Sequence, residues 1–285
     1  MCKKQSGIMD QYKLPLGKYI ETFVDWLVDN FSALFDFISD SLEAIIEAFT
    51  GALLWLHPVA FIVVICVLVI ALHRSIPLVI YSIVSLLLIW NLGYWTETMQ
   101  TLSLVLYATL FCIIIGLPLG IYAAHHSWLY TILRPILDLM QTVPTFVYLI
   151  PTLTLFGLGV VPGLISTIIF AIAAPIRLTY LGISEVPHEL VEAGESFGAN
   201  KWQILLRIEL PAAASNIAAG VTQCIMLSLS MVVIAALVGA DGLGKPVVRA
   251  LNTVDIASGF EAGLAIVLLA ILLDRLFKKR GSDQA

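Results

Sequence analysis

The chain has 285 residues, of which 60% are hydrophobic and only 12% are charged, and its mean hydropathy is +0.97. Soluble domains carry roughly 25% charged residues, so this composition excludes an ordinary soluble enzyme and indicates a polytopic membrane protein. The formal net charge of −5, without a basic stripe that carries interleaved aromatic residues, gives no reason to expect a nucleic-acid partner.

Residues 1–17 form a polar amino-terminal tail. Lys3 and Lys4 are followed by IMDQYKLPLG, which lacks the apolar region of a secretory signal peptide. We therefore expect the tail to remain on the mature protein.

Residues 18–51 are amphipathic. Acidic residues recur at steps of three, four or seven and form one stripe, and apolar residues fill much of the remaining surface. The acidic residues are Glu21, Asp25, Asp29, Asp36, Asp40, Glu43 and Glu47. This pattern predicts a helix that is too charged to span a membrane. We expect it to lie on the membrane surface or to pack on the spans. A dedicated regulatory or partner-docking helix is the alternative.

Seven apolar segments follow, and they predict an all-α fold with about seven transmembrane helices. They cover residues 53–72, 76–93, 99–124, 143–159, 161–181, 212–240 and 259–274. We assign residues 52–98 to peripheral transmembrane helices and residues 99–274 to a core domain that contains a polar loop at 185–211. Prolines inside or beside these runs predict either kinks around a water-lined path or ordinary helix ends.

Lys and Arg residues in short loops predict the orientation of the chain. The strongest basic cluster lies in the tail at 275–285 and comprises Arg275, Lys278, Lys279 and Arg280. It predicts a cytoplasmic carboxyl terminus that contacts anionic lipid. Counting back through seven spans places loops at 73–74, 125–134 and 185–207 on the same side, and the amino-terminal helix outside.

No group of residues in the apolar runs has the spacing of a catalytic or metal site. Runs 99–124, 143–176 and 212–240 contain no Asp, Glu, Lys or Arg, so they lack the ionisable residue that a proton- or sodium-coupled carrier usually keeps at depth. The cysteines and histidines lack ligand spacing and are expected to pack. GADGLGKP at 239–246 has proline where a phosphate-binding loop needs Ser or Thr. We expect the energy source to lie in a partner.

Two pairs of glycines four residues apart occur in apolar segments, in GLPLG at 116–120 and in GFEAG at 259–263. Such pairs let helix backbones approach closely. We expect packing within the chain, and dimerisation is the alternative.

The stretch EAGESFGANKWQILLRIELP at 192–211 interrupts two apolar runs with charges. It reads Glu192-Ala193-Gly194, three residues, Gly198, nine residues, Ile208, one residue and Leu210-Pro211. This spacing resembles the EAA loop of permease subunits of bacterial ABC importers, with Gly194 in place of the second alanine. In that family the segment forms short coupling helices that dock in a groove of the ATPase subunit.

Residue types in this stretch suit that role. Glu185, Glu189, Glu192 and Glu195 recur at steps of three and four and lie near one helical face. Gly198 can bend the chain between two short helices, and Pro211 fits the first turn of the next span.

Further segments resemble the glycine betaine/proline betaine branch of these permeases. They are LDLMQTVPTFVYLIP at 137–151, GVVPG at 159–163, APIRLTYLGISEVP at 174–187 and IMLSLSMVVIAALVGADGLG at 225–244. The resemblance covers residues 14–275 and implies the type I ABC importer permease fold in a bacterial cytoplasmic membrane.

The resemblance also implies partners. They are a second copy of the permease, two ATPase subunits that hold ATP and magnesium, and an extracytoplasmic binding protein, which we expect to be a separate polypeptide because the chain stops at Ala285. The chain itself is expected to bind no cofactor or metal and to catalyse no covalent chemistry.

The expected substrate is glycine betaine, with proline betaine or proline as further candidates. Aromatic faces attract a quaternary ammonium, so Phe146, Tyr148 and Phe156 are candidates for the path. The polar candidates are Gln141, Thr142, Gln223, Ser228 and Ser230. A permease for choline, carnitine or another small amine or amino acid is the alternative, and a secondary carrier or channel is the alternative of a different class.

Overall fold

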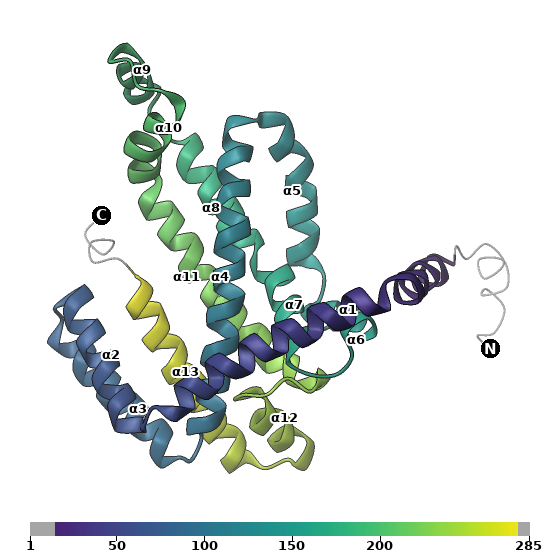
Figure 1. The fold of residues 1–285 in the computed structure, drawn as a ribbon. Helices are drawn as coiled ribbons and strands as arrows, with labels where there is room; N and C mark the ends of the chain where they lie inside the picture. Colours follow the sequence, from purple (N-terminus) through teal and green to yellow (C-terminus); the bar gives the residue numbers. More distant parts are fainter. Residues whose placement is uncertain (1–14, 279–285) are drawn as a thin grey trace, which may run out of the picture.

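The computed structural model describes residues 15–278, and within this range the chain is helical and contains no strand (Figure 1). The helices are α1 (Leu16–Trp55), α2 (Pro58–His73), α3 (Ile76–Asn91), α4 (Trp95–His125), α5 (Ser127–Thr142), α6 (Leu149–Phe156), α7 (Val160–Ala171), α8 (Ala173–Ser184), α9 (His188–Ser196), α10 (Lys201–Ile204), α11 (Leu210–Ala235), α12 (Gly244–Thr253) and α13 (Ile256–Phe277). The 3₁₀ turns η2 (Thr145–Tyr148) and η4 (Ala236–Val238) and the π-helical turn η3 (Leu205–Glu209) complete the described elements.

Helices α4, α7, α8 and α11 pack together as the centre of the bundle. Small residues bring their backbones close. A Cβ atom on Gly120 of α4 would lie 2.7 Å from the carbonyl oxygen of Ile176 in α8, and one on Gly116 would lie 3.2 Å from Pro175. The expected packing of the GLPLG glycines within the chain is therefore confirmed. Gly263 of the second pair has no neighbour within 4 Å of such a Cβ atom among the described residues.

The all-α membrane fold is confirmed, but the count of seven continuous spans is not. Four stretches within residues 15–278 are long and apolar enough to cross a membrane, and two bent helix pairs raise the number to six at most. Helices α2 and α3 have 16 residues each. At a rise of about 1.5 Å per residue each is shorter than a hydrocarbon core of about 30 Å.

The largest difference from the sequence-based prediction lies at residues 127–156. The sequence predicts a loop at 125–134 and a span at 143–159, whereas α5 begins at Ser127 and the chain bends by 105° between α5 and the η2–α6 segment. Pro144 explains the bend. It lacks an N–H group and keeps the preceding Val143 extended, at φ −66° and ψ 131°.

Helix α1 lies across the bundle (Figure 1) and is bent by 97° from α2. Its apolar face packs on the bundle through Ile46, which is buried, and through Phe49, whose ring contacts Tyr107 at a centroid distance of 5.4 Å. The seven acidic residues of the stripe are exposed. The helix therefore has the amphipathic character that its sequence predicts.

The carboxyl end of α13 contacts the end of α2. This end of α13 points toward the end of the bundle that carries α9 and α10 (Figure 1), and Nε2 of His73 at the end of α2 lies 3.0 Å from the carbonyl oxygen of Lys278. The predicted basic residues Lys279 and Arg280 lie outside the described residues.

Candidate functional site

A helical hairpin of α9 and α10 projects from one end of the bundle (Figure 1). The turn between the two helices is determined by residues within it. Gly198 has φ +79°, a conformation that favours glycine, and its N–H donates to the carbonyl of Glu195 at 2.8 Å. The N–H of Ala199 donates to the carbonyl of Gly194 at 3.0 Å, which completes the glycine-based cap of α9.

The start of α10 is capped as well. The side chain of Asn200 accepts from the N–H of Gln203, and the side chain of Gln203 accepts from the N–H of Asn200, both at 2.9 Å. This reciprocal capping box fixes the entry into α10. The two short helices therefore meet in a defined turn.

The hairpin folds back on the start of the next span. Gly194 is buried, and a Cβ atom there would lie 2.5 Å from Cδ1 of Ile208. Leu210 begins α11, and Pro211 lies in its first turn, where the missing N–H costs little. Two conspicuous positions of the quoted spacing, Gly194 and Ile208, are thus in contact.

The outer surface of the hairpin is both apolar and acidic. Phe197 is 92% exposed and Trp202 is 72% exposed, and Leu190 and Leu206 are exposed beside them. The acidic residues of the hairpin region, Glu185, Glu189, Glu192 and Glu195, are exposed, as is Ala193. Exposed aromatic residues rimmed by charge are typical of a protein–protein contact.

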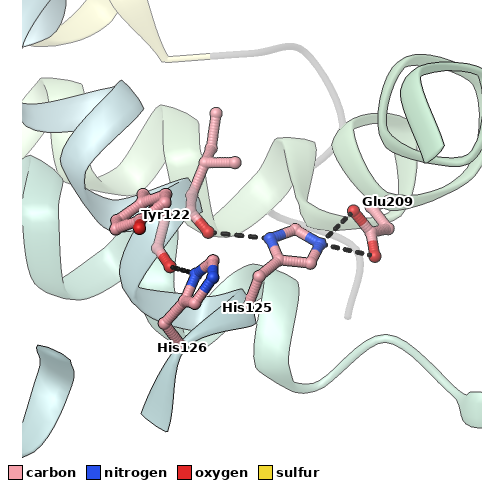
Figure 2. Close-up of polar contacts among 5 residues, drawn as sticks. Tyr122, His125, His126 and Glu209 are labelled. Atoms are coloured by element: carbon pink, nitrogen blue, oxygen red, sulfur yellow. Dashed lines mark hydrogen bonds and ion pairs between the residues drawn. The ribbon is translucent and has the colours of Figure 1, made fainter. Parts of the chain in front are cut away.

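An ion pair between the half-exposed His125 and the buried Glu209 joins this region to α4. Figure 2 shows His125 between the carbonyl of Ile121 and the carboxylate of Glu209: Nδ1 lies 2.9 Å from the carbonyl, and Nε2 lies 3.1 Å and 3.2 Å from the two carboxylate oxygens. A carbonyl only accepts, so Nδ1 is the donor to Ile121, and Nε2 faces both oxygens of the carboxylate. The side chain of Glu209 is 10% exposed.

The sequence predicts a packing role for His125 and no role for Glu209. Glu209 is the last charged residue before the uncharged run from 212 to 240, which is the sequence signal that could have drawn attention to it. Next to His125, the ring of His126 stacks on Tyr122 at a centroid distance of 4.2 Å.

The candidate path residues separate into groups. Gln141 and Thr142 end α5, and Phe146 and Tyr148 follow in η2, where the hydroxyl of Tyr148 donates to the carbonyl of Met140 at 2.7 Å. The bend at Pro144 therefore brings these four together.

The other candidates lie elsewhere. Gln223 and Ser230 are exposed seven positions apart on α11, so they share a face. Ser228 is fully buried, and Phe156 packs on Phe35 of α1 at a centroid distance of 5.3 Å.

The long apolar helices define a polytopic membrane protein, and the α9–α10 hairpin projects from its bundle. The chain belongs to the family of binding-protein-dependent transport system inner membrane components, whose model matches residues 116–279.

Relatives and a solved structure agree with this family. The chain is 44% identical to the glycine betaine/carnitine transport permease protein GbuB of Listeria monocytogenes, over 95% of this chain and 98% of that one. It is 43% identical to the glycine betaine/proline betaine transport system permease protein ProW of Escherichia coli, over 95% of this chain and 76% of that one. A structure of the MetNI methionine ABC transporter matches with a TM-score of 0.57 at 21% identity, over 63% of this chain and 90% of that one.

The predicted class and fold are thereby confirmed. The chain is an inner-membrane transport subunit with the type I ABC permease fold, and ATP hydrolysis belongs to a separate ATPase. Among residues 15–278, no three His, Cys, Asp or Glu side chains are grouped as a metal site.

Proposed function

We propose that this chain forms the translocation path of an ATP-driven importer of glycine betaine, with proline betaine or proline as further substrates. The observation that carries the proposal is the exposed α9–α10 hairpin, whose Phe197 and Trp202 offer an apolar contact to an ATPase. The betaine assignment is supported by the similarity to GbuB and ProW over nearly the whole chain.

The complete transporter contains two copies of this permease, two ATPase subunits that hold ATP and magnesium, and a separate extracytoplasmic binding protein. The hairpin faces the cytoplasm, together with the carboxyl terminus. Helix α1 then lies at the outer surface, in contact with membrane lipid. Clustered basic residues near the carboxyl end support this orientation.

Coupling runs from the hairpin into several helices. The stretch that contains Glu192, Ala193, Gly194, Gly198, Ile208, Leu210 and Pro211 forms the docking hairpin and its connection to α11. Closure of the ATPase pair moves the hairpin. The movement passes to α8 through residues 185–187, to α11 through the Gly194–Ile208 contact, and to α4 through the His125–Glu209 pair.

Substrate passes along a surface that includes Gln141, Thr142, Phe146, Tyr148, Gln223 and Ser230. Phe146 is 57% exposed, and an exposed aromatic ring attracts the quaternary ammonium of a betaine by about 0.5–2 kcal/mol. Ser228 is fully buried and Phe156 packs on Phe35 of α1, so we do not include these two in the surface.

The test is transport by the permease in proteoliposomes with its ATPase and a binding protein. We expect uptake of labelled glycine betaine that needs ATP, survives an uncoupler and is reduced by unlabelled proline betaine. Stronger competition by choline or carnitine would move the substrate assignment to those amines. Uptake that proceeds without ATPase and collapses with the uncoupler would show a secondary carrier and refute the proposal.

Alanine variants test the path residues separately. Phe146→Ala, Tyr148→Ala and Gln223→Ala should each lower the rate of uptake while stimulated ATP hydrolysis persists. Unchanged uptake by all three, at normal expression, would remove these residues from the path.

A further inference from the structure

Helix α5 carries a polar stripe along one side. The stripe recurs at steps of three and four, as a helical face requires, and comprises Ser127, Thr131, Arg134, Asp138 and Gln141. The opposite side is apolar. There, Leu133, Leu137 and Met140 pack with residues of α4, α7 and α8, whereas Ile136 is 49% exposed.

One charged residue of α8 meets this stripe. Nη2 of Arg177 donates to Oδ1 of Asp138 at 2.6 Å, and the two side chains remain 30% and 52% exposed. Nε of Arg177 is buried and has no hydrogen-bond partner among the described residues. Arg134 is exposed one turn from Asp138 on the same side of α5. The three groups thus carry two positive charges and one negative charge.

These charges lie midway along the helices rather than in a loop, on an exposed side of α5. Asp138 is roughly 17 Å along α5 from its start at a rise of about 1.5 Å per residue. The neighbouring Leu137 is buried against Ala173 and Ile176, which lie in the middle of the 160–184 span. Half of a hydrocarbon core of about 30 Å is a similar depth. Ionised groups at that depth are expensive against lipid and mark a pathway or a water-filled cavity.

An aromatic pair lies between α5 and α8, on the side of the charged cluster that is nearer the α9–α10 hairpin. The rings of Tyr130 and Tyr180 stack with a centroid distance of 3.4 Å and an interplanar angle of 3°. Tyr130 lies one turn before Arg134, and Tyr180 lies one turn after Arg177. The charged cluster is therefore bounded on that side and exposed on the other.

We infer that Arg134, Asp138 and Arg177 form a site for a zwitterionic solute within the translocation path. This inference rests on the proposed betaine import. A guanidinium holds a carboxylate through parallel N–H donors, and two guanidinium groups beside one carboxylate leave one positive charge for an incoming carboxylate. The carboxylate of Asp138 faces the cationic end of the same molecule. A site with one sign of charge would favour only half of such a solute.

Water access to Asp138 is the first test. Single cysteines replace Asp138, Arg134 or Ile136 in a permease without native cysteines, assembled with the ATPase and the binding protein. A trimethylammonium methanethiosulfonate reagent is added, since thiolates react only where water reaches them. We expect Asp138→Cys and Arg134→Cys to react about tenfold faster than Ile136→Cys. Equal rates at positions 138 and 136 would overturn the site, because the two positions are similarly exposed in the chain.

Coupling is the second test. It distinguishes a substrate site from an ion pair that only holds α5 and α8 together, which we call a clamp. The neutral pair Asp138→Asn/Arg177→Gln should lower uptake of glycine betaine at least about tenfold, with ATP hydrolysis stimulated by loaded binding protein kept within about twofold. The charge-swapped pair Asp138→Arg/Arg177→Asp should not restore uptake. Restored uptake, or wild-type uptake by the neutral pair, would show a clamp only.

A matched control uses the exposed ion pair of Lys245 and Asp241, whose side chains are 45% and 46% exposed. Its neutral variant should transport as the wild type does. Absence of betaine uptake by the wild-type complex would refute the proposed function instead. The labelling result would still decide whether water reaches the surface around Asp138.

Discussion

Nε2 of His125 lies 3.1 Å from Oε2 of Glu209, and this contact joins the end of α4 to the π-helical turn that precedes α11. The two residues are separated by 84 positions in the chain. The α9–α10 hairpin is therefore tied to a central helix as well as to its own neighbours in sequence.

Removing one member of this pair should destabilise the protein and weaken coupling. Glu209→Ala removes the acceptor of Nε2 of His125, and because that side chain is 43% exposed, water replaces the acceptor and the cost is about 0.5–1.5 kcal/mol. We expect a lower unfolding temperature in detergent and less uptake per ATP hydrolysed. Both are measured on the assembled transporter.

The double variant His125→Leu/Glu209→Leu is the control. Replacing both partners by apolar groups is often nearly neutral for stability. We expect the unfolding temperature to recover while uptake per ATP stays low. Full recovery of transport would mean that the pair serves stability alone.

Gly198 should tolerate only residues that adopt a left-handed conformation. A Cβ atom there meets nothing within 4 Å, so the cost of a side chain is the positive φ of +79°, about 1–2 kcal/mol. Gly198→Val should insert normally but abolish uptake and substrate-stimulated ATP hydrolysis.

Gly198→Asn is the matched variant, because asparagine enters this conformation more readily than other residues. It should keep most of the stimulated hydrolysis. Equal activity of the valine and asparagine variants would show that docking does not depend on the left-handed conformation at Gly198.

The exposed aromatic residues of the hairpin should carry much of the ATPase affinity. Phe197→Ala and Trp202→Ala should each weaken copurification of the ATPase by at least 1–2 kcal/mol, about tenfold in the dissociation constant. Binding is measured by titrating detergent-solubilised permease with ATPase. Leu251→Ala, which removes another exposed apolar side chain on α12, should bind as the wild type does.

Gly120 should resist substitution where Gly263 does not. A Cβ atom on Gly120 would also lie 2.8 Å from Cβ of Thr179, so the backbones of α4 and α8 must separate. Overpacking of this kind costs about 1–3 kcal/mol. Gly120→Ala should lower the unfolding temperature by several degrees, and Gly263→Ala should leave it within experimental error. A comparable fall in unfolding temperature in both variants would show that Gly263 also packs closely against a neighbour.

The cap of α13 should make stability depend on acid pH. The hydroxyl and the backbone N–H of Ser258 donate to Asp255 and lower the pKa of its carboxyl. A lowered folded-state pKa contributes stability above the unfolded value of about 3.9 and loses it as pH falls through the folded value. The advantage of the wild type over Asp255→Asn in unfolding temperature should shrink between pH 7 and pH 3. A constant difference would contradict this.

Local features of the fold could be predicted from the sequence, and contacts between distant residues could not. The turn at Gly198 and the start of α11 at Pro211 follow from the conformational limits of glycine and proline, so a twenty-residue pattern was enough to place them. The amphipathic character of α1 follows from the spacing of its acidic residues.

Helix α5 is not predicted because Arg134 and Asp138 lower the hydropathy of a segment that packs on the bundle through one side only. A search for uniformly apolar spans ignores a helix that has one polar side. The same limitation hid the Asp138–Arg177 pair and the His125–Glu209 pair, whose partners come from different helices.

The π-helical turn at 205–209 has one more consequence. A π turn holds one residue more than an α turn, so every side chain that follows is rotated by about 100° relative to an uninterrupted helix. That extra residue turns Glu209 inward to His125 and sets which face of α11 presents Gln223 and Ser230. Deleting a single residue here would leave the hairpin and the span each folded, but it would rotate one relative to the other about the helix axis.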